Sequence, residues 1–211
     1  MSAPEQPDSV ALVEAWLSDE AGFEEVFDRY RKRLRQMVKL RLDRRLYARI
    51  DVDDVLQEAF LEAFRKLPEY RDRSSDLPVF LWLRLIVGEK LIDLHRHHLG
   101  VQMRDADREV SIYRGPMPAA SSVALAAQLM GSVTSPSRAA LRAESRLQIQ
   151  EALNMMDPMD REVLTLRHFE QLSNSETAQV LEITQQAASN RYVRALKRMK
   201  EMLTMVRGGD D

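Results

Sequence analysis

Apolar residues recur at helical spacing through most of the first half of the chain. The clearest example runs from Val52 to Leu67, where apolar positions follow the i, i+3, i+4, i+7 order of one helix face. We expect Pro68 to end that helix. An amphipathic pattern from Phe23 to Met37 predicts the helix before it, and the apolar stretch Leu77–Val87 predicts a following helix that is buried on most sides.

The second half of the chain begins with a change of pattern. Gly, Pro and Ser punctuate residues 100–138, which we interpret as a linker containing one short helix at Ser122–Met130. Helical spacing returns at 138–156. The segment Asp157-Pro158-Met159-Asp160 then predicts a new helix, with an Asp N-cap and Pro in the first turn.

These patterns predict an all-α fold of two small helical domains joined by a long linker, the second a helix-turn-helix bundle. The predicted divisions are an N-terminal extension with a short helix at Val10–Leu17 (1–19), a first domain (20–99), the linker (100–138) and a second domain (139–207).

Ser173–Lys200 predicts two helices joined by a tight turn. Ser173 and Glu176 have capping-box spacing, and Thr184 suits the N-cap of the second helix. We expect its inner face to hold Ala188, Tyr192, Ala195, Leu196, Met199 and Leu203. The outer face holds Gln185, Gln186, Ser189, Asn190, Arg194 and Lys197. Such side chains can bond base edges and phosphates, which indicates a DNA-binding helix-turn-helix; an amphipathic hairpin with a solvated basic face is the alternative.

Composition narrows the function classes. The chain has no Cys, which excludes disulfide frameworks, Cys-ligated zinc and thiol catalysis. Lys and Arg number 31 against 33 Asp and Glu, but basic residues crowd between Arg29 and Arg49 while acids collect between Asp51 and Glu62. This asymmetry favours an anionic polymer on one surface and a protein on another, although solvated helix faces give similar runs.

Several other classes of function find little support. The start MSAPEQPDSV lacks the features of a secretory signal, so we expect a cytoplasmic protein, and the Leu77–Val87 stretch is too short for membrane insertion. The histidines His95, His97 and His98 invite a metal interpretation, but positive charge at a helix C-terminus is the simpler account. We expect no cofactor, no metal and no enzymatic activity, because no catalytic triad or Gly-rich phosphate loop is visible.

Three motifs of the chain resemble those of one known protein family. Asp54-Val55-Leu56-Gln57-Glu58-Ala59-Phe60 is similar to the region 2.2 signature of that family. Trp82-Leu83, Ile86 and Ile92-Asp93 are similar to the run that spans regions 2.3 and 2.4. Residues Asp157–Met199 resemble region 4, and Leu153–Leu164 resembles the entry to that region. These motifs are similar to those of the extracytoplasmic-function group of sigma-70 factors.

The resemblance implies a bacterial initiation factor whose partners are core RNA polymerase, through its β′ coiled coil and β flap, and promoter DNA, and it leaves open an anti-sigma factor. The polymerase-binding residues it implies are Asp53, Asp54, Gln57, Glu58 and Leu61. The predicted −35 contacts are Gln185, Gln186, Ser189, Asn190, Arg191 and Arg194, with Lys197 and Arg198 mainly on phosphates. The predicted −10 contacts are Trp82, Arg84, Lys90, Arg96 and His97, which would hold the opened strand by stacking and charge.

Two positions depart from the family pattern, and one other class of protein stays open. Glu89 stands where relatives usually carry Asn, and Glu182 stands where they often carry Gly, which matters if φ there is positive. A dimeric helix-turn-helix repressor or activator is the main alternative, although such a protein would not need the Asp54–Phe60 signature.

Overall fold

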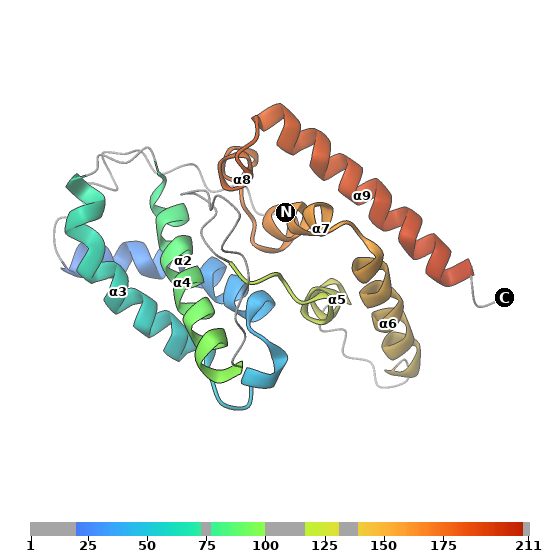
Figure 1. Ribbon diagram of the computed structural model, residues 1–211, viewed down its shortest axis with the longest axis horizontal. Helices are drawn as coiled ribbons and strands as arrows, with labels where there is room; N and C mark the ends of the chain where they lie inside the picture. The colour runs from blue at the N-terminus through green and yellow to red at the C-terminus, as the bar shows by residue number, and fades with distance from the viewer. Residues whose placement is uncertain (1–19, 73–76, 100–116, 131–138, 209–211) are drawn as a thin grey trace. The chain divides into compact units, whose positions relative to one another are not determined.

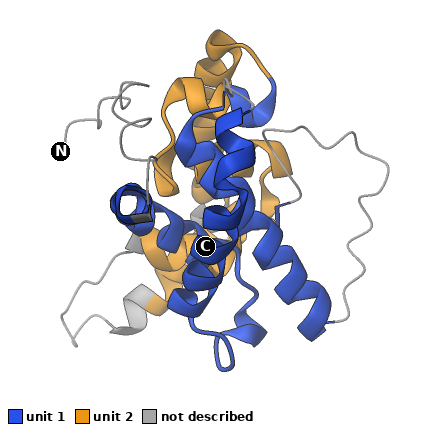
Figure 2. Ribbon diagram, turned by 90° about the vertical axis from the view of Figure 1, so that its left-hand side faces the viewer, with its two compact units in different colours: residues 1–118, 179–182 blue, residues 119–178, 183–211 orange. Residues whose placement is uncertain are grey.

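The computed structural model describes residues 20–72, 77–99, 117–130 and 139–208. These residues are helical apart from short connections, which confirms the all-α prediction. The expected short helix at Val10–Leu17 lies outside the described residues. Two compact units are present, residues 1–118 with 179–182 and residues 119–178 with 183–211 (Figure 2).

The first unit is built on three long helices that all pack on one another (Figure 1). They are α2 (Glu20–Arg41), α3 (Val52–Asp72) and α4 (Val79–Leu99), and a short 3₁₀ helix (Arg44–Leu46) lies between the first two. The apolar residues that predict these helices face inward, and α4 is buried at nearly every position from Val79 to Val87, as predicted. None of the described helices has an 18-residue stretch apolar enough to cross a membrane.

An aromatic cluster fills the core between α2, α3 and α4. The Phe23 ring centroid lies 5.3 Å from that of Phe60 and 6.3 Å from that of Trp82, and Phe27 meets Phe60 edge-on at 5.2 Å. Offset and edge-on pairs of this kind add about 0.5–1.5 kcal/mol each beyond the area they bury. The cluster therefore fixes the three helices against one another.

The prediction that Pro68 ends α3 is wrong, because the helix continues to Asp72. A proline inside a helix removes one backbone hydrogen bond and costs about 3 kcal/mol. Tertiary contacts beyond it offset that cost: the Tyr70 ring stacks on Trp82 at 4.3 Å, and the Tyr70 hydroxyl donates to the Leu77 carbonyl at 2.8 Å. Local sequence predicts the break, and packing overrides it.

The second unit contains five α-helices among the described residues: α5 (Ser122–Met130), α6 (Ala139–Met155), α7 (Pro158–Leu164), α8 (Asn174–Leu181) and α9 (Gln185–Gly208). A π-helical turn, Thr165–Phe169, extends α7. Both α6 and α7 pack on α9, so the long last helix forms the centre of this unit.

The helix starts expected in the second unit are confirmed. The Asp157 carboxylate accepts from the Met159 backbone N–H at 2.9 Å, and Pro158 opens α7. At α8 both halves of the capping box form, since the Glu176 N–H donates to the Ser173 hydroxyl at 3.1 Å and the Ser173 N–H donates back to the Glu176 carboxylate at 2.6 Å. Caps of this kind satisfy backbone donors that the helix itself leaves free.

The short helix expected inside the linker is confirmed as α5. It packs on α6, and Leu125 and Ala126 are fully buried, so it belongs to the compact second unit. Just before it, the buried guanidinium of Arg41 donates to the Pro118 carbonyl at 2.8 Å and ties residue 118 to α2.

Candidate nucleic-acid interface

One face of α3 presents acidic and polar side chains around an apolar one. Asp54, Gln57 and Glu58 are exposed, and among them Leu61 is 55% exposed. Asp53 differs from these residues, because Arg35 of α2 donates to its two carboxylate oxygens at 2.5 and 2.6 Å. The structure thus brings together four of the five predicted polymerase-binding residues and engages the fifth in an ion pair between helices. We call Asp54, Gln57, Glu58 and Leu61 the α3 surface.

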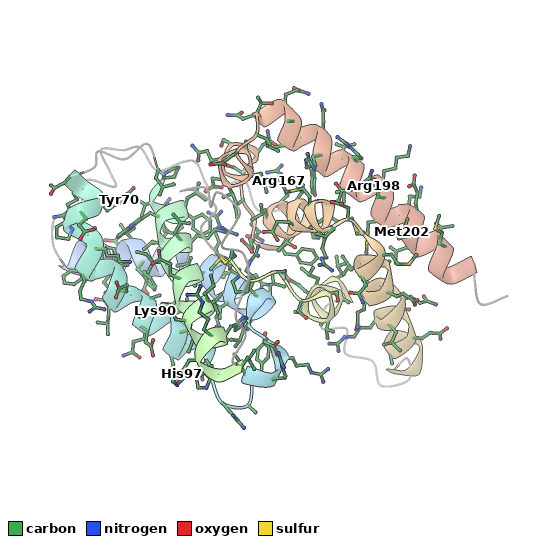
Figure 3. All side chains as sticks on the ribbon, viewed as in Figure 1. Tyr70, Lys90, His97, Arg167, Arg198 and Met202 are labelled. Atoms are coloured by element: carbon green, nitrogen blue, oxygen red, sulfur yellow. The ribbon has the colours of Figure 1, made fainter. Side chains whose placement is uncertain are left out.

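A groove between α3 and α4 adjoins the α3 surface. Its lining residues are Glu58, Lys90, Asp93, Leu94, Arg96 and His97. The Lys90 amino group lies 4.0 Å from the Glu58 carboxylate, and Lys90 and His97 are shown on α4 in Figure 3. Three of the five predicted −10 residues, namely Lys90, Arg96 and His97, therefore gather at one groove that Glu58 shares.

The other two predicted −10 residues are buried. Trp82 is only 9% exposed and packs between Phe23 and Tyr70, while Arg84 is 1% exposed. A side chain enclosed on all sides cannot stack on a base or reach a phosphate, so the prediction of direct DNA contact by these two residues is corrected. Both belong to the packed interior of the first unit.

The histidines near the end of α4 differ in environment. His95 is buried, and its Nε2 accepts from the Asp43 backbone N–H at 3.0 Å, which requires that nitrogen to be unprotonated. Burial lowers the pKa of His95. Hydrogen bonds from the Arg45 side chain and backbone lower the pKa of the adjacent Asp43 to about 2. His95 is thus a neutral acceptor that fixes the connection after α2, which corrects the expected role as positive charge at the helix end.

The Glu89 departure is accommodated by an ion pair. Its carboxylate lies 3.1 Å from the Lys66 amino group of α3, and the side chain is half exposed. An acid at this place therefore has a cation beside it, and the pair joins α4 to α3.

The turn between α8 and α9 is a Schellman motif. The Ile183 N–H donates to the Ala178 carbonyl at 3.0 Å, and the Glu182 N–H donates to the Gln179 carbonyl at 3.1 Å. Glu182 has φ of 53°, so the turn has the positive φ that favours Gly, with a Glu in its place. The Thr184 hydroxyl then caps α9 by accepting from the Ala187 N–H at 3.1 Å, as predicted.

The outer face of α9 carries most of the predicted −35 residues. Gln185, Gln186, Ser189, Asn190, Arg194 and Lys197 are all exposed. The Gln186 amide donates to the Asn190 side-chain oxygen at 3.2 Å, so these two amide groups lie side by side on the exposed face. At the start of the helix, the Asn174 amide donates to the Gln185 carbonyl at 2.8 Å and links α8 to α9.

Arg198 belongs to the packing between α7 and α9. Its guanidinium pairs with the carboxylate of Asp160, whose side chain is only 3% exposed (Figure 3). The Arg198 side chain is itself 47% exposed, so its phosphate contact stays a prediction beside this ion pair. Arg191 is half-buried at the flank of the same helix.

Two aliphatic residues of α9 are exposed. Leu196, expected inside, is 45% exposed, and Val193, which the sequence did not single out, is 64% exposed. The helical phase of Val193 relative to Ser189 and Lys197 is the signal that could have shown its outward position.

Known proteins match this chain in sequence over both of its units. The sigma-70 region 4 family model matches residues 146–199, which lie in the second unit apart from residues 179–182. The ECF RNA polymerase sigma factor SigD of Mycobacterium tuberculosis strain H37Rv is 29% identical over 199 residues, 94% of this chain and 84% of that protein. These matches support the extracytoplasmic-function group of the sigma-70 family for this chain. It is a sigma factor that directs transcription through core RNA polymerase and promoter DNA.

Two further comparisons extend the likeness of this sigma factor. The RNA polymerase sigma-H factor of Pseudomonas aeruginosa strain PAO1 is 27% identical over 159 residues, covering 72% of this chain and 73% of that one. The solved structure of CnrH in complex with the cytosolic domain of CnrY has a TM-score of 0.53 at 21% identity, and covers 92% of this chain and 96% of that chain. The second likeness is one of fold.

Proposed function

We propose that the two units of this sigma factor divide its work, with the α3 surface binding core RNA polymerase and the outer face of α9 reading the −35 element. The single observation that carries the proposal is the exposure of Leu61 within an acidic surface on α3, in a chain that also presents amide and basic side chains on α9. Reading DNA on a polymerase that holds two elements at fixed spacing lets a few base contacts suffice.

The α3 surface is suited to a protein partner. An aliphatic side chain in water gains about 25 cal/mol per Å² when a partner covers it, and the surrounding acids select a partner with basic groups. By family resemblance that partner is the coiled coil of the polymerase β′ subunit. Asp53 contributes by holding α3 to α2 through Arg35, so its role is to position the surface.

We assign the −10 element to the α4 side of the groove, where Lys90, Arg96 and His97 gather. The cationic side chains of Lys90 and Arg96 beside the opened strand would offset phosphate charge without reading sequence. Trp82 and Arg84 are left out of this face because their side chains are buried.

The outer face of α9 is assigned to base reading in the major groove. Gln186 and Asn190 carry amides that can bond an adenine edge, and Arg194 and Lys197 carry charge for guanine or phosphate. The Thr184 cap fixes the start of α9, and the N-terminal residues of a recognition helix are the ones presented to the major groove. This role involves no catalysis by the chain itself, and it takes place in the cytoplasm, where polymerase works.

A regulatory protein partner is a further part of the proposal. CnrH, the solved relative in fold, is bound to the cytosolic domain of CnrY. A protein that covered the α3 surface of this chain would exclude polymerase by simple competition.

Run-off transcription tests the proposal directly. Purified protein and core polymerase are incubated with a promoter library in which the −35 and −10 elements are randomised, and the transcribed templates are sequenced. We expect enrichment in two separate blocks, with none for core polymerase alone. Absence of initiation together with tight operator binding by the protein alone would instead favour a dimeric repressor.

A further inference from the structure

Val193 lies at the centre of the outer face of α9. It is one turn beyond Ser189 and Asn190 and one turn before Lys197, at i−4, i−3 and i+4, which are neighbours on a helix surface. All three of these residues are exposed, and Val193 itself is 64% exposed. The buried side of the helix, with Ala188 and Ala195, is opposite.

An exposed aliphatic side chain is common on protein surfaces and by itself indicates little. Its surroundings are mostly polar: Ser189, Asn190 and Lys197 are exposed polar or basic neighbours, and the aliphatic neighbour on the helix surface is Leu196 at i+3. Gln186 and Asn190 hydrogen-bond to each other in the turn before it. Val is also stiff at χ1, so its methyl groups are held in position at little entropic cost on binding.

We propose that Val193 is a specificity-determining residue that contacts the 5-methyl group of a thymine in the −35 element. In the major groove the thymine methyl is the apolar feature of the base edges, and an aliphatic side chain is its complement. The proposal rests on the proposed function and adds a base preference to it. Asn190 and Gln186 address polar edges, and Val193 addresses the methyl group between them and the phosphates held by Lys197.

The test removes the thymine methyl group from the DNA and shortens the Val193 side chain of the protein. On the promoter selected by run-off transcription, each −35 thymine is changed singly to deoxyuridine, which lacks only the 5-methyl group. Binding of holoenzyme is then measured for the wild type and for Val193→Ala. We expect one deoxyuridine to weaken wild-type binding about fourfold, the value of one buried methyl. Val193→Ala should show that loss with thymine already, and no further loss with deoxyuridine.

Leu196→Ala is the matched control. Leu196 is also an exposed aliphatic residue of α9, but it lies beside the buried stripe, next to Tyr192 and Met199, so its variant should keep the wild-type response to deoxyuridine. The proposal is overturned if no deoxyuridine weakens wild-type binding, if Val193→Ala keeps the wild-type response, or if the selected element has no A·T pair. In each of these cases −35 selectivity persists, whereas failure of the proposed function would abolish it.

Discussion

At the scale of single residues, two basic side chains that are adjacent on one helix can have different roles. Arg198 and Lys197 are adjacent on α9, yet only Arg198 has a buried acid, Asp160, as its partner. We predict that Arg198→Met lowers the free energy of unfolding by about 1–3 kcal/mol, because the carboxylate loses its partner inside the protein. Urea denaturation measures this change.

The salt dependence of −35 binding separates the two neighbours further. Lys197→Ala should reduce the slope of log K against log salt by about one, as expected for one lost phosphate contact, and leave stability unchanged. Arg198→Met should reduce the slope less, because the Arg198 charge is paired with Asp160. A slope reduced by Arg198→Met and not by Lys197→Ala would reverse our assignment.

His95 makes the stability of the first unit depend on pH. Burial lowers the pKa of His95 below its ordinary value of 6.5, so the folded chain binds that proton more weakly than the unfolded chain. The nearby Asp43 carboxylate raises the pKa of His95, whereas the Arg45 guanidinium lowers it, as burial does. The free energy of unfolding is therefore at its full value above the unfolded pKa and falls as pH drops below it.

We predict that His95→Gln reduces this loss of stability between about pH 7.5 and 5.5, since an amide oxygen can accept from the Asp43 N–H without titrating. Urea denaturation at several pH values gives the measurement. His98→Gln, an exposed change on the same helix, is the control and should keep the wild-type profile. Equal profiles for all three proteins would show that His95 is not the titrating group.

At the scale of elements, the Schellman turn that joins α8 to α9 contains avoidable strain. Glu182 has a left-handed backbone, which costs a residue with a Cβ about 1 kcal/mol. We predict that Glu182→Gly raises the free energy of unfolding by about 0.5–1 kcal/mol, while Glu182→Ala gives no gain because it keeps the Cβ. Thermal and urea denaturation of the two variants test this, and equal stabilisation by both would assign the gain to loss of charge.

The elements that sequence could predict are those whose signals are local. Asp157, Ser173 and Thr184 each cap a helix through a partner two or three residues away, so spacing alone located them. The prediction that Pro68 ends the helix failed because the stabilising contact is not local. Tyr70 stacks on Trp82 of the next helix, and this contact stabilises the end of α3.

The same difference between local and long-range signals applies to the residues of the candidate site. Helical periodicity placed Glu58, Leu61 and the outer face of α9 correctly on exposed surfaces. It could not show that Arg198 pairs with Asp160 or that Arg35 pairs with Asp53, because these partners are 38 and 18 residues apart in the chain. Long-range pairing decides which charges stay available to a ligand.

At the scale of the whole molecule, polymerase binding and −35 binding should be separable by mutation. We predict that Glu58→Lys weakens binding to core polymerase about tenfold or more, since it places like charge against a basic partner, and leaves binding of the full chain to −35 duplex unchanged. Fluorescence anisotropy measures both affinities. Glu25→Lys, an exposed reversal on α2, is the matched control. Loss of −35 binding with polymerase binding intact would refute the assignment of surfaces.

On the proposed assignment, in which polymerase binds Glu58 and the −10 strand binds Lys90, the proximity of these two side chains would make polymerase and the strand thermodynamically linked ligands. While the Glu58 carboxylate lies 4.0 Å from the Lys90 amino group, each charge is partly neutralised by the other. Polymerase that engages Glu58 releases Lys90 for phosphate, and by reciprocity a bound strand that engages Lys90 increases affinity for polymerase by the same factor. Because exposed ion pairs are worth at most about 1 kcal/mol, that factor stays below about fivefold. The pair thus gives the free factor a slight bias against promoter DNA, and assembly on polymerase removes it.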